Sequence, residues 1–235
     1  MSIEPVGVTT ISFDADGTLW DFEQVMRHSL GLSLIELRRL APTCAGLLTI
    51  ARMMAIRNQV AEELRGKGTN LEQVRLAAFR RTLQHIGVSD DVLAAHLNAV
   101  YLKHRFEDIQ LFGDVLPTLD ALQGRYVLGL LSNGNSYPER CGLEGRFQFV
   151  VFSQDHGVEK PDPRLFEIAV EQAGCSGREF LHVGDSLEND VAGANGAGVR
   201  SVWLNRDRKR NDSNIQADFE IASLAELVDI CKQLG

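Results

Sequence analysis

The feature that most constrains the fold is the alternation of short apolar runs with helical segments that begins at Gly113. Each run has the length of a strand, and most of them end at polar or small residues. We expect strands at residues 127–131, 149–152, 180–183, 201–204 and 219–221. Helices are expected between them, at residues 114–123, 163–174, 189–197 and 223–234. Such alternation predicts a parallel sheet with helices on both faces.

A further strand is expected much earlier in the chain, at residues 8–13. This run is apolar and β-branched, and it stops abruptly at Asp14, which is typical of a buried strand that leads into a functional loop. The chain between this strand and the others shows only helical spacing. Asn70 and Ser89 are expected to act as N-caps of two of about four helices there.

The sequence therefore predicts an α/β protein with two domains. Residues 1–19 and 109–235 would form a core with a Rossmann-like, doubly wound parallel sheet. Residues 20–108 would form an all-α cap domain inserted after the first strand. Residues 20–22 come soon after the acidic segment at residues 14–18 and lead into the cap, and they could either contact a substrate or pack as a linker.

Composition excludes several classes of protein. The chain has 235 residues, of which 44% are hydrophobic, which is too apolar for a disordered chain. A net charge of -8 argues against nucleic-acid binding through phosphate contacts. No apolar run reaches the ~20 residues of a membrane helix, and the N-terminal residues lack a secretory pattern. The four cysteines have no metal-binding spacing, so we expect reduced thiols in a cytoplasmic protein. The oligomeric state stays unknown.

Polar side chains follow several of the expected strands. Asp14 and Asp16 follow the first strand, Ser132 the second, and Asp185 the fourth, while Lys160 lies just beyond the third. Ligands of open parallel sheets bind outside the carboxyl ends of the strands, near the switch in strand order. Three carboxylates, a hydroxyl and an ammonium suit phosphoryl transfer, in which catalysis consists mainly of positioning and electrostatic stabilisation.

Carboxylates alone would repel a phosphate. A hard dication such as Mg²⁺ resolves this conflict, because it prefers oxygen ligands and bridges carboxylate to phosphate. Lys160 would add positive charge, and Ser132 would supply a neutral donor. Gly17 and Gly134 would let the backbone approach the ligand closely.

The spacing of Asp14 and Asp16 allows a division of labour. In an extended chain, residues two apart lie on the same face. One carboxylate could act as the nucleophile, while the other gives a proton to the leaving oxygen and later takes one from water. Different surroundings would separate their pKa values.

The segment from Lys160 to Pro163 predicts a rigid entry into a helix. A residue before proline is pushed toward extended geometry, so Lys160 should not be helical. Asp162 can cap the following helix, and Pro163 suits its first turn. Lys160 would thus be held facing the site.

Four segments, in order, resemble the motifs of the haloacid dehalogenase-like superfamily. They are DADGT at residues 14–18, Ser132 in LLSNG, Lys160 in EKPDP, and GDSLENDVAGANGAG at residues 184–198. The resemblance covers nearly all of the core. The cap resembles the family only in being helical and inserted after the first motif.

This resemblance implies a role for each matching residue. Asp14 would be the nucleophile and a metal ligand, and Asp16 the general acid and base, with its backbone carbonyl also contacting the metal. Ser132 and Lys160 would hold the phosphoryl oxygens, and Asp185 would complete the Mg²⁺ site.

Two further roles follow from the same resemblance. Asp190 would support the metal from behind its ligands, and Asn133 would offer its backbone N–H to the phosphate. The six histidines of the chain show no ligand spacing, so we expect them to be surface residues or satisfied core residues.

The expected function is that of a Mg²⁺-dependent phosphatase acting on a small phosphorylated metabolite through an aspartyl-phosphate. A phosphomutase and a non-catalytic phosphate-binding protein on the same fold remain alternatives. The resemblance speaks against a haloacid dehalogenase, because those enzymes lack the carboxylate that Asp16 supplies. A signalling receiver domain would be shorter and would lack the helical insertion. The sequence leaves the substrate open, along with the cap residues that select it.

Overall fold

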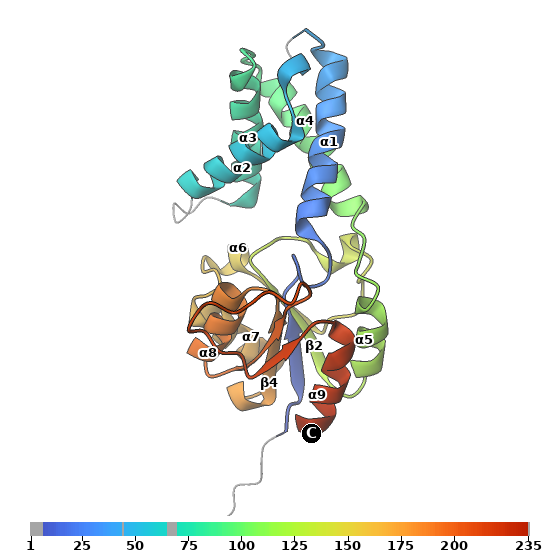
Figure 1. The fold of residues 1–235 in the computed structure, drawn as a ribbon, viewed down its shortest axis with the longest axis vertical. Helices are drawn as coiled ribbons and strands as arrows, with labels where there is room; N and C mark the ends of the chain where they lie inside the picture. The colour runs from blue at the N-terminus through green and yellow to red at the C-terminus, as the bar shows by residue number, and fades with distance from the viewer. Residues whose placement is uncertain (1–6, 44, 65–69, 235) are drawn as a thin grey trace, which may run out of the picture. The chain divides into compact units, whose positions relative to one another are not determined.

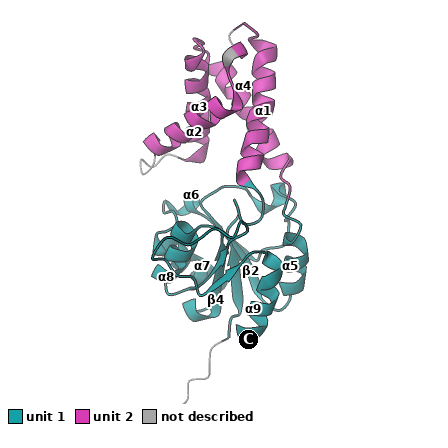
Figure 2. Ribbon diagram, viewed as in Figure 1, with its two compact units in different colours: residues 1–21, 111–235 teal, residues 22–110 magenta. Residues whose placement is uncertain are grey.

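The computed structural model describes residues 7–43, 45–64 and 70–234, and the chain divides into two compact units (Figure 2). The core unit comprises Met1–Asp21 and Leu111–Gly235, and the helical unit comprises Phe22–Gln110. Both boundaries lie two residues later than predicted. The reason is Trp20, which is fully buried and forms bridges with Asp16 and Leu111, so that it belongs to the core unit.

The described residues of the core unit contain a six-stranded parallel sheet in the order β3-β2-β1-β4-β5-β6. The strands are β1 (Thr10–Phe13), β2 (Val127–Ser132), β3 (Phe149–Phe152), β4 (Phe180–Gly184), β5 (Arg200–Leu204) and β6 (Phe219–Ile221). The predicted doubly wound fold is confirmed. The strand order switches between β1 and β4, where ligands of such sheets bind.

The register of the sheet places the ends of β1, β2 and β4 close together. Phe13, the last residue of β1, lies opposite Leu130 of β2 and Val183 of β4. All four residues of β1 are buried, because the strand has a neighbour on each edge and helices over its faces. Residues that directly follow these three strands therefore meet at one edge of the sheet.

Helices cover both faces of this sheet, with α5 and α9 on one side and α7 and α8 on the other (Figure 1). Their bounds are α5 (Val115–Leu122), α7 (Pro163–Ala173), α8 (Ala192–Gly196) and α9 (Leu227–Leu234), and a single turn, α6 (Ser153–His156), follows β3. The entry into α7 is as predicted. Asp162 accepts a hydrogen bond from the N–H of Arg164, Pro163 occupies the first turn, and Gly174 ends the helix at a φ of 68°.

The segment expected as one helix at residues 189–197 is different. It begins earlier with a π-helical turn, Leu187–Val191, which continues into α8. The turn opens at Ser186, whose hydroxyl accepts from the N–H of Asn189. Within this π-helical turn, the side chain of Asp190 is buried and lies against Gly184, the last residue of β4. A Cβ on Gly184 would lie 2.2 Å from the Cγ atom of Asp190, so glycine is required there.

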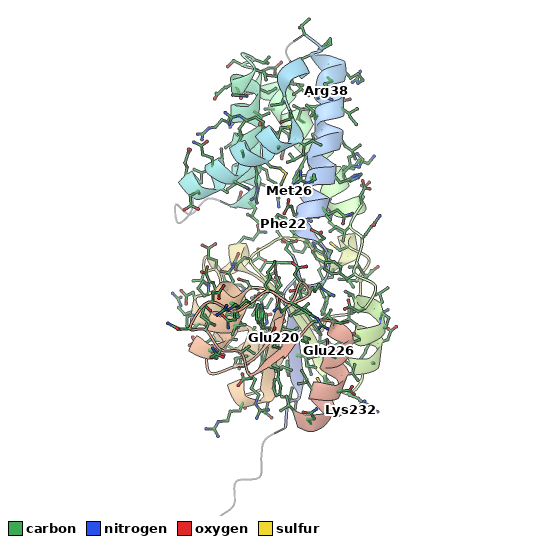
Figure 3. The ribbon with its side chains drawn as sticks, viewed as in Figure 1. Phe22, Met26, Arg38, Glu220, Glu226 and Lys232 are labelled. Atoms are coloured by element: carbon green, nitrogen blue, oxygen red, sulfur yellow. The ribbon has the colours of Figure 1, made fainter. Side chains whose placement is uncertain are left out.

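The helical unit contains four α-helices among its described residues: α1 (Phe22–Leu40), α2 (Ile50–Leu64), α3 (Leu71–His85) and α4 (Asp91–Glu107). They enclose their own apolar core, in which buried side chains of α1, α3 and α4 meet. Phe22, Met26 and Arg38 follow one another along α1 (Figure 3). Met26 is buried in that core and Phe22 packs against it.

One of the two expected helix caps is correct. The side chain of Asn70 accepts from the N–H of Gln73 and begins α3, as predicted. The prediction of Ser89 is wrong, because Asp90 caps α4 by accepting from the N–H of Leu93. An aspartate caps as well as a serine does, and here it stands one residue closer to the first turn.

Two further sequence expectations concern the whole chain. None of the described helices is long and apolar enough to cross a membrane. Cys141, Cys175 and Cys231 are free thiols, and Cys44 lies outside the described residues.

Candidate active site

Asp14 stands at the carboxyl end of β1 and is held there by the sheet. Its backbone N–H donates to the carbonyl of Val183 in β4, at 2.8 Å. The side chain is almost fully buried, and its Oδ1 atom lies 2.7 Å from the Nζ atom of Lys160. The central strand thus delivers a carboxylate to the point where the strand order switches.

Lys160 has all three of its ammonium protons engaged. Its Nζ atom donates to Oδ1 of Asp14 at 2.7 Å, to Oδ1 of Asp190 at 2.5 Å and to the carbonyl of Leu131 at 3.0 Å. The side chain is buried, as predicted from its place at the entry to α7. A phosphoryl oxygen that binds this ammonium must therefore replace one of these acceptors.

Asp14, Asp185 and Asp190 each offer an oxygen, and these three oxygens lie within 4.8 Å of one another. Burial raises the pKa of Asp14 well above its ordinary value, and the other two carboxylates add to this, while Lys160 opposes it. Desolvation, then Asp190, raises the pKa of Asp185 to about 6, although its side chain keeps access to solvent. A single ammonium cannot balance three negative charges.

The ammonium of Lys160 is balanced mainly by Asp190. Burial would raise the pKa of Asp190, yet the charge of Lys160 and a hydrogen bond from His182 hold it well below its ordinary value. Burial would lower the pKa of Lys160, but Asp14 and Asp190 outweigh this effect and raise it. Lys160 and Asp190 therefore form a buried ion pair, and Asp14 and Asp185 are left with excess negative charge.

A chain of buried polar groups supports Asp190 from inside the sheet. Its Oδ1 atom lies 3.2 Å from Nε2 of His182, whose Nδ1 atom lies 2.7 Å from Oγ of Ser12. Burial lowers the pKa of His182, so the ring is neutral. Because an ionised Asp190 can only accept, Nε2 of His182 carries the proton and Ser12 donates to Nδ1. The backbone N–H of Ser186 donates to the other oxygen of Asp190, at 2.9 Å.

These residues fit a hard divalent cation. All the ligand atoms that they offer are carboxylate oxygens, which Mg²⁺ prefers, and a dication would offset the charge that raises the pKa values of Asp14 and Asp185. The backbone leaves room beside Asp185, since a Cβ on Gly17 would lie 2.6 Å from its Oδ2 atom. Gly17 has a φ of 92°, which favours glycine.

Asp16 occupies a different environment from Asp14. It is only half-buried, and its Oδ1 atom accepts from the indole Nε1 of Trp20 at 2.7 Å. A Cβ on Gly134 would lie 2.8 Å from Oδ2 of Asp16 and 3.3 Å from Oγ of Ser132. The turn after β2 therefore lies next to Asp16, and the two carboxylates of the first motif have distinct partners.

The structure brings the predicted residues together. For Asn133, the contact that it shows is made by the side chain, whereas the predicted contact involves the backbone N–H. The side chain of Asn133 binds the backbone of Lys160, donating to its carbonyl at 2.9 Å and accepting from its N–H at 2.8 Å. The backbone N–H of Asn133, predicted to bind phosphate, stays a prediction. Ser132 accepts from the N–H of Gly134 at 3.0 Å.

Sequence reasoning missed three supporting residues: Trp20, His182 and Ser12. Trp20 follows the first motif directly, and its place two residues before the helical unit was the available signal. His182 and Ser12 are polar residues inside otherwise apolar strands, and their register as neighbours in β1 and β4 is the signal that only the sheet order supplies.

Known proteins resemble this chain over most of its length. The model of the haloacid dehalogenase-like hydrolase family matches residues 8–198. A glyceraldehyde 3-phosphate phosphatase of Methanopyrus kandleri is 30% identical over 97% of this chain and 99% of its own. A 2-haloacid dehalogenase structure from Pseudomonas syringae pv. Tomato is 30% identical, with a TM-score of 0.83, over 97% of this chain and all of that one.

A third relative is the hydrolase YfnB of Bacillus subtilis, whose structure was solved bound to magnesium. It is 26% identical, with a TM-score of 0.77, over 96% of this chain and 99% of that one. The family match covers well over half of the sequence. Three of the four motifs lie at the strand ends described above, and the motif of Lys160 lies at the entry to α7. This chain belongs to the haloacid dehalogenase-like hydrolases.

Proposed function

We propose that this hydrolase is a Mg²⁺-dependent phosphatase that releases phosphate from a small phosphorylated metabolite through an aspartyl-phosphate on Asp14. The observation that carries the proposal is the contact between Asp14 and the buried ion pair of Lys160 and Asp190. This contact fixes the position of one oxygen of Asp14 and leaves the carboxylate next to Asp185, in a cluster whose charge calls for a cation.

In the first step, an oxygen of Asp14 attacks phosphorus as the bond from phosphorus to the ester oxygen breaks. Asp16 donates a proton to that leaving oxygen, so that an alcohol departs. In the second step, Asp16 takes a proton from a water molecule, which attacks phosphorus and releases Asp14. The hydrogen bond from Trp20 holds Asp16 in position for both transfers.

Ser132, Lys160 and nearby backbone N–H groups would hold the phosphoryl oxygens. When bound, Mg²⁺ would supply positive charge that offsets the phosphoryl group and the carboxylates of Asp14 and Asp185. A backbone carbonyl of Asp16 is proposed as a further ligand, and Asp190 as a support behind the ligands. The magnesium bound to YfnB supports this choice of metal.

The proposed substrate class is a small phosphate ester. The relative from Methanopyrus kandleri, which matches along nearly its whole length, is named for such a substrate.

A haloacid dehalogenase is a second candidate, because the matching structure from Pseudomonas syringae carries that title. Asp16 disfavours it, since a dehalogenase has no leaving oxygen to protonate. Release of halide from a 2-haloacid by the purified protein, without phosphatase activity, would reject our proposal. A phosphomutase would return the phosphoryl group to a sugar, and comparing free phosphate with isomerised product separates that case.

The test is hydrolysis of p-nitrophenyl phosphate and a panel of small phosphate esters by the purified chain. We expect release of phosphate with Mg²⁺ and none in EDTA. Asp14→Asn should be folded and close to inactive. Asp207→Asn, which changes an exposed aspartate in the loop between β5 and β6, is the matched control and should retain activity. Turnover by Asp14→Asn, or in EDTA, would contradict the proposal.

A further inference from the structure

A second cluster of potential metal ligands lies in the helical unit, away from the motifs. His28 of α1 and His104 of α4 both contact the same oxygen of Asp108, the residue that follows α4. Nε2 of His28 lies 2.9 Å from Oδ2 of Asp108, and Nδ1 of His104 lies 2.8 Å from it. One ligand atom from each residue lies within 4.8 Å of the others. The two histidines lie far apart in the sequence, so no ligand spacing was visible there.

We propose that His28, His104 and Asp108 bind one transition-metal ion, with Zn²⁺ as the best match. Two imidazole nitrogens and a carboxylate oxygen form a ligand set that zinc takes in proteins, with water completing the coordination. Imidazole suits zinc, copper, nickel and iron far better than it suits magnesium. This set therefore differs in chemistry from the all-carboxylate cluster of the core unit.

The two nitrogen–oxygen distances require only a small adjustment. With metal–ligand bonds of about 2.0–2.1 Å in a tetrahedral site, neighbouring ligand atoms lie about 3.3 Å apart. The observed distances of 2.8 and 2.9 Å are hydrogen bonds, so each nitrogen would have to retreat by about 0.5 Å from the carboxylate. The side chains have 50%, 26% and 36% of their surface exposed for His28, His104 and Asp108, which leaves room for this rotation and for water ligands.

The charges around Asp108 favour a cation. The hydrogen bonds from His28 and His104 lower the pKa of the Asp108 carboxyl, so it is ionised. Burial opposes this shift. An ion that binds here would take the place of the two ring N–H donors on Oδ2 of Asp108.

A second histidine–carboxylate contact in the helical unit, between His96 and Glu36, differs from the proposed site. His96 of α4 lies 2.8 Å from Oε1 of Glu36 in α1, so it joins the same two helices. Arg39, however, donates to both oxygens of Glu36, at 2.8 and 2.9 Å. Glu36 is thus held by a guanidinium on both oxygens and has only one imidazole beside it, so His96 and Glu36 provide a matched control for the proposed site.

The position of the cluster gives the ion a structural consequence. His28 lies in the second turn of α1, the first helix of the unit, and Asp108 directly follows α4, the last. A bound ion would tie the beginning of the unit to its end, across 80 residues of chain. Binding to the folded state alone stabilises it by mass action. We therefore expect the ion to raise the melting temperature of the chain.

The experiment uses the full chain, stripped with EDTA and then held in excess Mg²⁺ so that the carboxylate cluster is supplied. Zn²⁺ is titrated by calorimetry and by ¹H–¹⁵N spectra of the histidine rings. We expect binding of one Zn²⁺ that shifts the ring signals of His28 and His104 but not of His96. His104→Gln and His28→Gln should each weaken this binding by at least about tenfold and remove the rise in melting temperature, whereas His96→Gln should do neither.

Three results would overturn the proposal. They are unchanged ring signals of His28 and His104 on addition of Zn²⁺, equal shifts of all the rings, and undiminished affinity in both site variants. Unchanged far-ultraviolet circular dichroism shows that each variant folds. Because the readout is metal binding, it stands apart from the phosphatase proposal, whose failure would leave it untouched.

Discussion

The side chain of Asn133 and the backbone of Lys160 hold each other through two opposed hydrogen bonds. The amide of Asn133 donates to the carbonyl of Lys160 at 2.9 Å, and the N–H of Lys160 donates to the amide oxygen at 2.8 Å. The pair locks the turn after β2 to the entry of α7. The ammonium that contacts Asp14 is therefore positioned from the neighbouring strand end.

Loss of this pair should slow catalysis without unfolding the protein. In Asn133→Ala we expect kcat to fall by about 10²-fold, because a displacement of about 1 Å at a catalytic group can have that effect. Steady-state kinetics on p-nitrophenyl phosphate measures it. Asn211→Ala is the control. The side chain of Asn211 donates to the carbonyl of Ile215 and accepts from the N–H of Ser213, in the loop between β5 and β6. Equal activity of both variants would contradict the positioning role.

Removal of the ammonium should reduce stability as well as activity. In Lys160→Met, the buried carboxylates of Asp14 and Asp190 lose their partner, and breaking a buried pair in this way costs about 3–5 kcal/mol. Urea denaturation at pH 7 measures the change in the free energy of unfolding. The double variant Lys160→Met with Asp190→Asn should recover part of the loss, because it removes a stranded charge. Additive losses would show that the two groups are not coupled.

The dependence of the free energy of unfolding on pH should reveal the raised pKa of Asp185. Its pKa in the folded chain is raised to about 6 from 3.8, so the folded state favours the protonated acid. The resulting stabilisation is present below pH 3.8 and is lost as the pH rises through about 6. In EDTA, Asp185→Asn should therefore gain stability relative to the wild type between pH 4 and pH 7.5.

We expect this gain to be on the order of 1 kcal/mol, because solvent screens the exposed side chain of Asp185. Urea denaturation at the two pH values measures it. With saturating Mg²⁺ at pH 7.5 the order should reverse, since the ion stabilises only the chain that keeps its carboxylate. An advantage of the variant that is equal at both pH values would contradict the raised pKa.

Asp16 should control the second half of the reaction as well as the first. p-Nitrophenolate leaves without a proton, so Asp16→Asn should still form the aspartyl-phosphate from p-nitrophenyl phosphate but should lose base catalysis of its hydrolysis. Stopped-flow absorbance should show a burst of about one p-nitrophenolate per chain, followed by turnover slowed by about 10²–10⁴-fold. With an alkyl phosphate, quenched-flow assay of the released alcohol should show no burst in Asp16→Asn, because an alkoxide needs a proton to leave. A linear time course at the wild-type rate would remove Asp16 from this role.

The core fold and most of the candidate site were predictable because both are indicated by short stretches of consecutive residues. The apolar runs mark the strands, and Asp14, Ser132 and Asp185 stand where those strands end. The family resemblance supplied the roles of these residues. The start of α7 just after Lys160 was also predictable, because the prolines that follow Lys160 restrict the backbone.

Contacts between distant segments were not predictable from local patterns. The bond of Trp20 to Asp16 looks in the sequence like ordinary packing after a motif. The pairing of His182 with Ser12 depends on which strands are neighbours, and the meeting of His28 with Asp108 depends on which helices pack together. The π-helical turn around Asp190 was missed because its sequence also suits an ordinary helix.

The central position of β1 has a consequence for how this protein is made. The strand is synthesised early, yet its two neighbours in the sheet begin only at Val127 and Phe180. Pairing over such separations is slow, and an unpaired apolar strand invites aggregation. On the ribosome, β1 therefore cannot be enclosed until β4 has emerged. Asp14, which directly follows β1, meets Lys160 and Asp190 only after those later segments have been synthesised.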